Sequence, residues 1–147
     1  MLRYTKGEEP DREGAIKHAD FTIEGEEFAA MDSDQPHDFT FNEAVSLQVT
    51  CRTQNGIDYY WERLTDGGEE GVCGWLKDRF GVPWQVAPKI LGKMLRDPDS
   101  AKVERVTVAF LKMKKLDIDA LKMAFNGETM RLGAVKWGLS AGYPARV

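Results

Sequence analysis

The stretch from residue 43 to residue 65 changes its hydrophobic period midway, and this change constrains the fold more than any other feature. Apolar and polar side chains alternate in residues 43–51, with Val45, Leu47, Val49 and Cys51 on one face and Ala44, Ser46, Gln48 and Thr50 on the other. Apolar side chains then recur at helical spacing, at Ile57, Tyr60, Trp61 and Leu64. A period of two predicts a half-buried strand, and the later spacing predicts an amphipathic helix over residues 54–65.

The chain continues with two further strands and then with helices. Residues 71–77 and 82–87 read as strands joined by a tight turn at residues 78–81. A short helix is predicted for residues 88–95. Asp97, Pro98, Asp99 and Ser100 form a helix-start signal, with Asp99 or Ser100 as the cap. Amphipathic helices are predicted for residues 101–113 and 117–125.

The N-terminal part reads as β structure. After a short strand end and a loop in residues 1–14, residues 15–23 alternate like a strand. The turn Glu24–Glu26 and a returning strand, Glu27–Met31, complete a hairpin. A polar loop over residues 32–42 leads to the strand and helix described above. Strands and helices in this order predict an α+β fold.

Composition bounds the class of protein. The 147 residues suit one domain, and 42% hydrophobic with 30% charged residues is ordinary for a globular protein. No apolar run approaches the ~20 residues of a membrane span, so a membrane partner is not expected. A net charge of -4 argues against a nucleic-acid partner, because phosphate binding needs a basic face. We expect a cytoplasmic protein with Cys51 and Cys73 as reduced thiols.

Three stretches of sequence together resemble one family. They are FTIEGEEFAAMD (21–32), FTFNEAVSLQVTC (39–51) and GGEEGVCGWLKDRFGVPWQVAP (67–88), and residues 103–125 continue the match. The sequence resembles the PhnB-like branch of the vicinal-oxygen-chelate (glyoxalase/bleomycin-resistance/dioxygenase) superfamily. The resemblance covers roughly residues 3–125.

The resemblance implies a glyoxalase-like fold of paired βαβββ modules, whose sheets curl around a cleft, in a homodimer. The first module would lack its opening strand and helix, because the segment that normally follows them stands at residues 3–10. We expect a glyoxalase-like domain over residues 1–125 and a C-terminal tail over residues 126–147. Val135, Trp137 and Leu139 alternate, so residues 132–139 either add a strand at the vacant sheet edge or form a loose tail.

Superfamily enzymes hold a divalent metal on His, Glu or occasionally Gln side chains that project from strands into the cleft. Gln85 matches the position where metal-dependent members place a Glu. A neutral amide is a weaker ligand and would stand alone here. We therefore predict no family-type metal site and no cofactor.

The polar strand faces supply the candidate ligand-binding residues. His18 and Asp20 share a face of the first long strand, so His18 is either a general base beside a carboxylate or a hydrogen-bonded surface residue. Trp84 is expected in the core and Trp75 at the border of the cleft or a dimer contact. Lys77, Asp78 and Arg79 read as a solvated turn with local salt bridges. The predicted ligand-binding residues are His18, Asp20, Ser46, Gln48, Trp75 and Gln85.

The leading functional hypothesis is a homodimeric protein that binds an unknown small molecule. One alternative is an enzyme of the superfamily, either a metal-assisted lyase or dioxygenase-like protein, or a 3-demethylubiquinone-9 3-methyltransferase, the label that relatives often carry. The Gly67-Gly68 pair does not supply a Rossmann cofactor cradle, because it lies between a predicted helix and a strand. A third reading is a truncated gene product whose remaining property is dimerisation.

Overall fold

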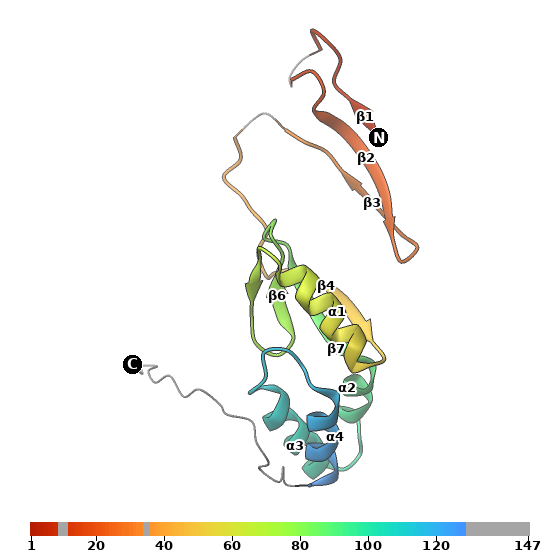
Figure 1. Cartoon of the computed structure of the whole chain (residues 1–147), viewed down its shortest axis with the longest axis vertical. Helices are drawn as coiled ribbons and strands as arrows, with labels where there is room; N and C mark the ends of the chain where they lie inside the picture. Colours follow the sequence, from red (N-terminus) through yellow and green to blue (C-terminus); the bar gives the residue numbers. More distant parts are fainter. Residues whose placement is uncertain (9–11, 34–35, 129–147) are drawn as a thin grey trace, which may run out of the picture. The chain divides into compact units, whose positions relative to one another are not determined.

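The computed structural model describes residues 1–8, 12–33 and 36–128, and within it the chain divides into two units, Met1–Thr40 and Phe41–Val147 (Figure 1). The predicted tail strand over residues 132–139 lies outside the described residues. The mixed α+β class is confirmed, with two sheets and four helices among the described residues. None of the helices in the described part of the chain is both long and apolar enough to cross a bilayer.

The first unit is a small antiparallel sheet. Its strands are β1 (Leu2–Arg3), β2 (Ile16–Ile23) and β3 (Glu26–Ala30), in the spatial order β1-β2-β3. Glu24 and Gly25 connect β2 to β3 with φ angles of 51° and 89°. Two consecutive left-handed residues are typical of the turn that matches the twist of a hairpin. The predicted hairpin is therefore confirmed.

One face of this hairpin is apolar and uncovered within its unit. Phe21 and Phe28 are cross-strand partners whose stacked rings lie 5.6 Å apart between centroids. Phe21 remains 44% exposed and Ile23 38% exposed. None of the described residues of Met1–Thr40 is buried. Since small β-sheets are marginal in water, burial of this apolar face would stabilise the unit.

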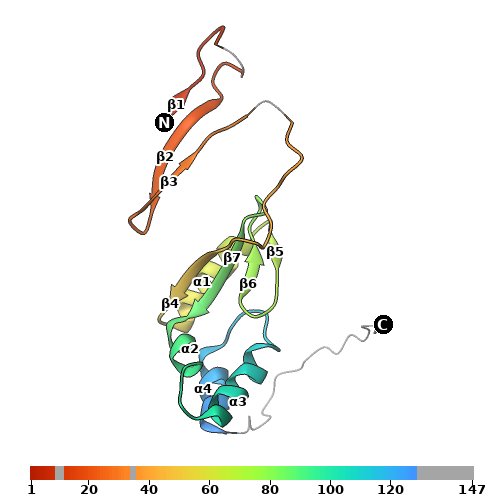
Figure 2. The ribbon, with the colours of Figure 1, turned by 180° about the vertical axis from the view of Figure 1, so that it is seen from behind.

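The second unit begins with a four-stranded sheet. It contains β4 (Leu47–Cys51), β5 (Glu69–Glu70), β6 (Trp75–Lys77) and β7 (Pro83–Pro88), in the order β4-β7-β6-β5. β4 runs parallel to β7, and the other neighbours are antiparallel. Helix α1 (Gln54–Thr65) connects β4 to β5 and covers one face of the sheet, and Figure 2 views the sheet from the other side.

Helix α1 forms where the sequence predicts it, because Thr53 caps its first turn by accepting the N–H of Gly56. Its inward face places Ile57 and Trp61 against the sheet. The core there consists of Cys51, Ile57, Trp61, Leu76, Val86 and Ile118. Trp84 packs against this core, as expected. Tyr60, predicted on the inward stripe, is 37% exposed and makes an edge contact with Tyr59.

Two predicted strands are shorter than expected. The strand predicted for residues 43–51 begins only at Leu47, because residues 43–45 form a turn in which Asn42 accepts the N–H of Ala44. The strand predicted for residues 71–77 is broken. Cys73 and Gly74 adopt left-handed φ angles of 59° and 82°. Their N–H groups leave the ladder and donate to the carbonyls of Met113 and Lys114 at 2.7 and 2.8 Å.

Three helices follow the sheet: α2 (Lys89–Met94), α3 (Ser100–Phe110) and α4 (Ile118–Asn126). Asp99 caps α3 and Asp117 caps α4 through their carboxylates. A second core cluster of Met94, Val106 and Leu121 joins them. Helix α3 ends at Phe110 and not at residue 113, because Lys112 and Met113 donate to the carbonyls three residues back, Ala109 and Phe110, and so no longer follow the α-helical pattern.

Candidate functional site

The four-stranded sheet has one face that no described helix of its unit covers, and the register of the strands aligns polar side chains across it. Gln48 of β4 lies opposite Gln85 of β7, and Gln85 lies opposite Trp75 of β6. These three residues therefore form one row across the sheet, which we call the open-face row. The alternate residues Val49, Val86 and Leu76 point to the other face and α1.

A hydrogen bond organises the centre of the open-face row. The side-chain amide nitrogen of Gln85 donates to the hydroxyl oxygen of Ser46 at 2.8 Å. Both side chains are half-buried, whereas Gln48 is exposed. This bond uses one of the two amide hydrogens of Gln85 and leaves its amide oxygen available as an acceptor. The row therefore offers neutral donors and acceptors beside an indole ring.

An ion pair borders the row. Lys77 Nζ lies 2.6 Å from Glu43 Oε1. The hydrogen bond with Glu43 raises the pKa of Lys77, and the same bond lowers the pKa of Glu43. Both residues line a small hollow of about 140 Å³, together with Glu69, Glu70, Gly71, Trp75 and Leu76. The sequence did not point to Glu43 as a member of this site. The alternation of residues 75–77 does place Lys77 on the same face as Trp75, so one partner of the ion pair could have been found.

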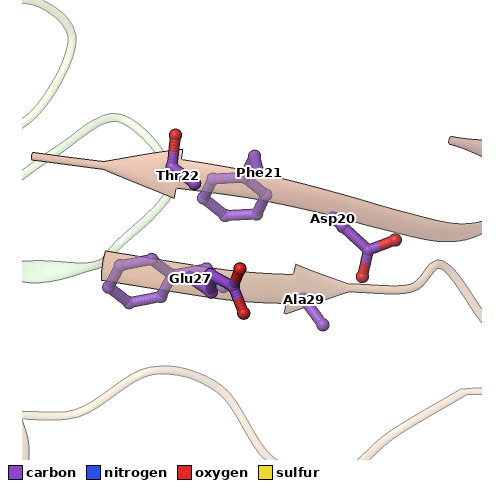
Figure 3. Close-up of a pocket in the computed structure, with 6 residues that line it drawn as sticks. Asp20, Phe21, Thr22, Glu27 and Ala29 are labelled. Atoms are coloured by element: carbon purple, nitrogen blue, oxygen red, sulfur yellow. The ribbon is translucent and has the colours of Figure 1, made fainter. Parts of the chain in front are cut away.

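The hairpin of the first unit carries the other two predicted residues. His18 Nε2 lies 2.7 Å from Asp20 Oδ1, and both side chains are substantially exposed. Asp20 also borders an open hollow of about 580 Å³ on the hairpin. Figure 3 shows Asp20, Phe21 and Thr22 on β2 beside Glu27 and Ala29 on β3.

The structure thus brings together four of the six predicted ligand-binding residues. Ser46, Gln48, Trp75 and Gln85 lie on one face of one sheet. His18 and Asp20 lie together on the other unit. Their role in the same ligand site stays a prediction.

The donor set of the open-face row does not fit the divalent metal of superfamily enzymes. The row and Ser46 beside it supply amides, an indole and a hydroxyl, all of them neutral. Divalent metals in such sites prefer imidazole, carboxylate or thiolate ligands, and a neutral amide is a weaker ligand. Across the described ranges, no three His, Cys, Asp or Glu side chains gather closely enough to hold a metal ion. We assign no metal-dependent step to this face.

Two carboxylates on the α1 side have depressed pKa values and contribute to stability in the acid range. The Trp61 indole donates to Glu70 at 3.0 Å and lowers the pKa of Glu70. Lys115 lies 2.6 Å from Asp58 and lowers the pKa of that carboxyl. A depressed native pKa adds stability above the unfolded pKa, and this stability is lost as the pH falls through the native value.

We therefore expect the thermal unfolding midpoint to fall as the pH drops below about 4. Glu70→Gln and Asp58→Asn should lower the midpoint at pH 7 and flatten its dependence on pH in the acid range. Glu62→Gln is the control, because this exposed side chain makes no hydrogen bond or ion pair with any described residue. Calorimetric scans from pH 3 to pH 7 measure the effect. Parallel curves for all four proteins would contradict it.

Comparisons with known proteins agree with the fold. The family described as 3-demethylubiquinone-9 3-methyltransferase matches residues 1–87. The structure is similar to that of a PhnB protein from Bacillus cereus, with 38% identity, 59% of this chain and 74% of that chain covered, and a TM-score of 0.55. A protein from Pseudomonas aeruginosa shares the fold at 21% identity, with 60% and 74% covered and a TM-score of 0.50. No curated protein matches significantly.

The family match extends over more than half of the chain, from β1 through most of β7. It includes the hairpin, the turn at Asp78 and the strands that carry Gln48, Trp75 and Gln85. The resemblance predicted from the sequence is confirmed. The chain belongs to the 3-demethylubiquinone-9 3-methyltransferase family, in its PhnB-like branch.

Proposed function

We propose that the protein binds a small molecule on the open face of its four-stranded sheet. The observation that carries this proposal is the open-face row, in which Gln48, Gln85 and Trp75 are aligned by strand register and Gln85 is oriented by Ser46. Amides and an indole recognise a neutral ligand with a flat ring and polar edges, because the ring packs on Trp75 while the edges hydrogen-bond to the amides. Such a surface binds and orients a ligand without ionised catalytic groups in the row.

Paired modules and a homodimer are part of the same proposal. The strand–helix–three-strand order of β4 to β7 corresponds to one glyoxalase-like βαβββ module. The apolar face of the hairpin, with Phe21, Ile23 and Phe28, is uncovered within its own unit. A second copy of the chain that covers this face would stabilise the hairpin by burying these side chains. We retain residues 1–125 as the glyoxalase-like domain and residues 126–147 as its tail.

The ligand prediction is tested with a library of neutral heteroaromatic compounds screened by ligand-observed NMR. Gln85→Ala should weaken the binding of the compounds found by about tenfold, since it removes one hydrogen bond and the partner of Ser46. Asn126→Ala, at the exposed end of α4, is the control and should leave binding unchanged. Compounds that bind both variants equally, or a library without any binder, would contradict the proposal.

Methyl transfer is the second candidate, and the family description favours it. A Rossmann-type cradle for S-adenosylmethionine uses a glycine-rich turn between a strand and a helix. Here Arg52 and Thr53 connect β4 to α1, and Thr53 is engaged as the helix cap. We expect no heat of binding when S-adenosylmethionine is titrated into the protein. Measurable binding would support the methyltransferase, and a stoichiometric metal in protein purified without chelator would support a metal-dependent enzyme.

A further inference from the structure

A third hollow lies between α3, α4 and the connecting residues 111–117. Its volume is about 670 Å³, which is within the range of small-molecule sites. Its floor is mostly apolar and consists of Ala109, Met113, Leu116, Ala120, Met123 and Ala124. None of the residues that line it belongs to the open-face row. The alanines leave room above the helices, and the two methionines adapt to ligands of different outline.

Three lysines stand at the rim of this hollow. Lys114 pairs with Glu70 at 3.4 Å, and Lys115 pairs with Asp58 at 2.6 Å. Lys112 is exposed and has no ion-pair partner among the described residues. It also borders an adjoining hollow over α3, lined in part by Val108 and Arg105. One ammonium group at the edge of the apolar floor is therefore available to an anion.

The segment that carries the lysines is held in place. The carbonyls of Met113 and Lys114 accept the N–H groups of Cys73 and Gly74. Gln54 donates to the carbonyl of Leu116 at 3.2 Å and accepts the N–H of Ile118 at 3.0 Å. A site fixed in this way loses little conformational entropy when a ligand binds.

Two carboxylates also reach the hollow, and both are engaged. Asp117 Oδ1 accepts the N–H of Ala120 at 2.8 Å as the cap of α4. Glu128 Oε1 accepts the side-chain amide of Asn126 at 3.2 Å. The rim therefore favours a single negative charge placed at Lys112, and a ligand with negative charges at both ends would meet Asp117 or Glu128.

We propose that this hollow binds an amphipathic anion with an aliphatic body, of the fatty-acid class. The aliphatic chain would lie on the floor formed by Ala109, Met113, Met123 and Ala124, and the carboxylate would pair with Lys112. Burial of each methylene group contributes about 0.8 kcal/mol, so the chain supplies most of the affinity. Lys112 favours a head group with negative charge over one with positive charge.

The test is calorimetric titration of the full chain with laurate, kept below its micelle concentration. Laurate should bind with one saturable site, and dodecyltrimethylammonium, with the same chain length and the opposite charge, should bind at least fivefold more weakly. Lys112→Glu should weaken laurate binding at least fivefold and should improve binding of the cationic probe. The control is Lys89→Glu, an exposed lysine of α2 outside the hollow, which should change neither affinity.

A second variant tests the floor without changing charge. Ala109→Leu fills the hollow from α3 and should weaken laurate binding, whereas Ala101→Leu on the exposed start of the same helix should not. Far-UV circular dichroism confirms that each variant is folded. Equal binding of both probes, or laurate binding that resists Lys112→Glu, would overturn the proposal. So would a change of oligomeric state in Ala109→Leu, because a second copy would then occupy the hollow.

Discussion

Replacing Gly74 with alanine should lower the free energy of unfolding by about 3 kcal/mol. Gly74 has a φ of +82°, where an L residue is strained. An added Cβ would lie 2.8 Å from the carbonyl oxygen of Val86 and 3.1 Å from the Leu116 Cδ1. The peptide cannot shift easily, because Gly74 donates to Lys114 and accepts from Val86, each at 2.8 Å.

The matched control for this prediction is Gly81→Ala. Gly81 has nearly the same φ, +80°, but its Cβ would meet no heavy atom within 4 Å. The Gly81→Ala substitution should therefore lower the free energy of unfolding only by the backbone strain, about 1 kcal/mol. Urea unfolding of the two variants separates strain from the steric clash. An equal loss in both would show that the contacts of Gly74 with Val86 and Leu116 contribute nothing.

The second large effect is expected from Leu121→Ala, which should lower the free energy of unfolding by about 3 kcal/mol. Leu121 is fully buried in the cluster with Met94 and Val106, so its removal leaves a cavity among α2, α3 and α4. Leu111→Ala is the control, because Leu111 is 57% exposed. It should cost less than about 1 kcal/mol.

This loss should reach the sheet as well as the helices. Gln54 connects the start of α1 to Leu116 and Ile118, and Ile118 belongs to the sheet core. We therefore expect far-UV circular dichroism and the near-UV signal of the tryptophans to report one shared transition at a lower urea concentration. Separate transitions for helices and sheet in the Leu121→Ala variant would contradict this coupling.

Periodicity predicted the elements whose structure is decided locally. Residues 54–65 were predicted as a helix and form Gln54–Thr65, because the cap at Thr53 and the inward stripe agree. The turn at residues 78–81 also formed as predicted. There Asp78 Oδ1 accepts the N–H groups of Phe80 and Val82, and Oδ2 accepts the Trp84 indole. Each of these contacts lies within six residues of Asp78.

Periodicity failed where distant residues decide the backbone. The alternation of residues 71–77 gave no sign that Cys73 and Gly74 turn away to reach Met113 and Lys114, forty residues further along the chain. Helix α3 also ends earlier than predicted, where Lys112 and Met113 donate to carbonyls three residues back. Lys77 was predicted to form local salt bridges, but its partner is Glu43. Side-chain alternation contains no information about such pairings.

The candidate site was predictable only in part, because alternation shows the face of a side chain but not its neighbours on other strands. Alternation placed Ser46 and Gln48 on the same face of their strand. It also placed Gln85 on the face of its own strand that points away from the Trp84 side chain. The parallel register of β4 and β7, which aligns Gln48 with Gln85, depends on tertiary packing. The resemblance to the PhnB-like branch predicted the family of the chain, and the match over residues 1–87 confirms that prediction.

The position of Cys51 gives this protein an internal reporter of local opening. Both thiols are free, but Cys51 is only 5% exposed at the end of β4, and burial raises its pKa. Cys73 is half-buried in the turn between β5 and β6. Thiol-reactive reagents should therefore modify Cys73 in the native state and reach Cys51 only when β4 separates from α1. The labelling rate of Cys51 measures how often the edge of the proposed ligand-binding sheet opens.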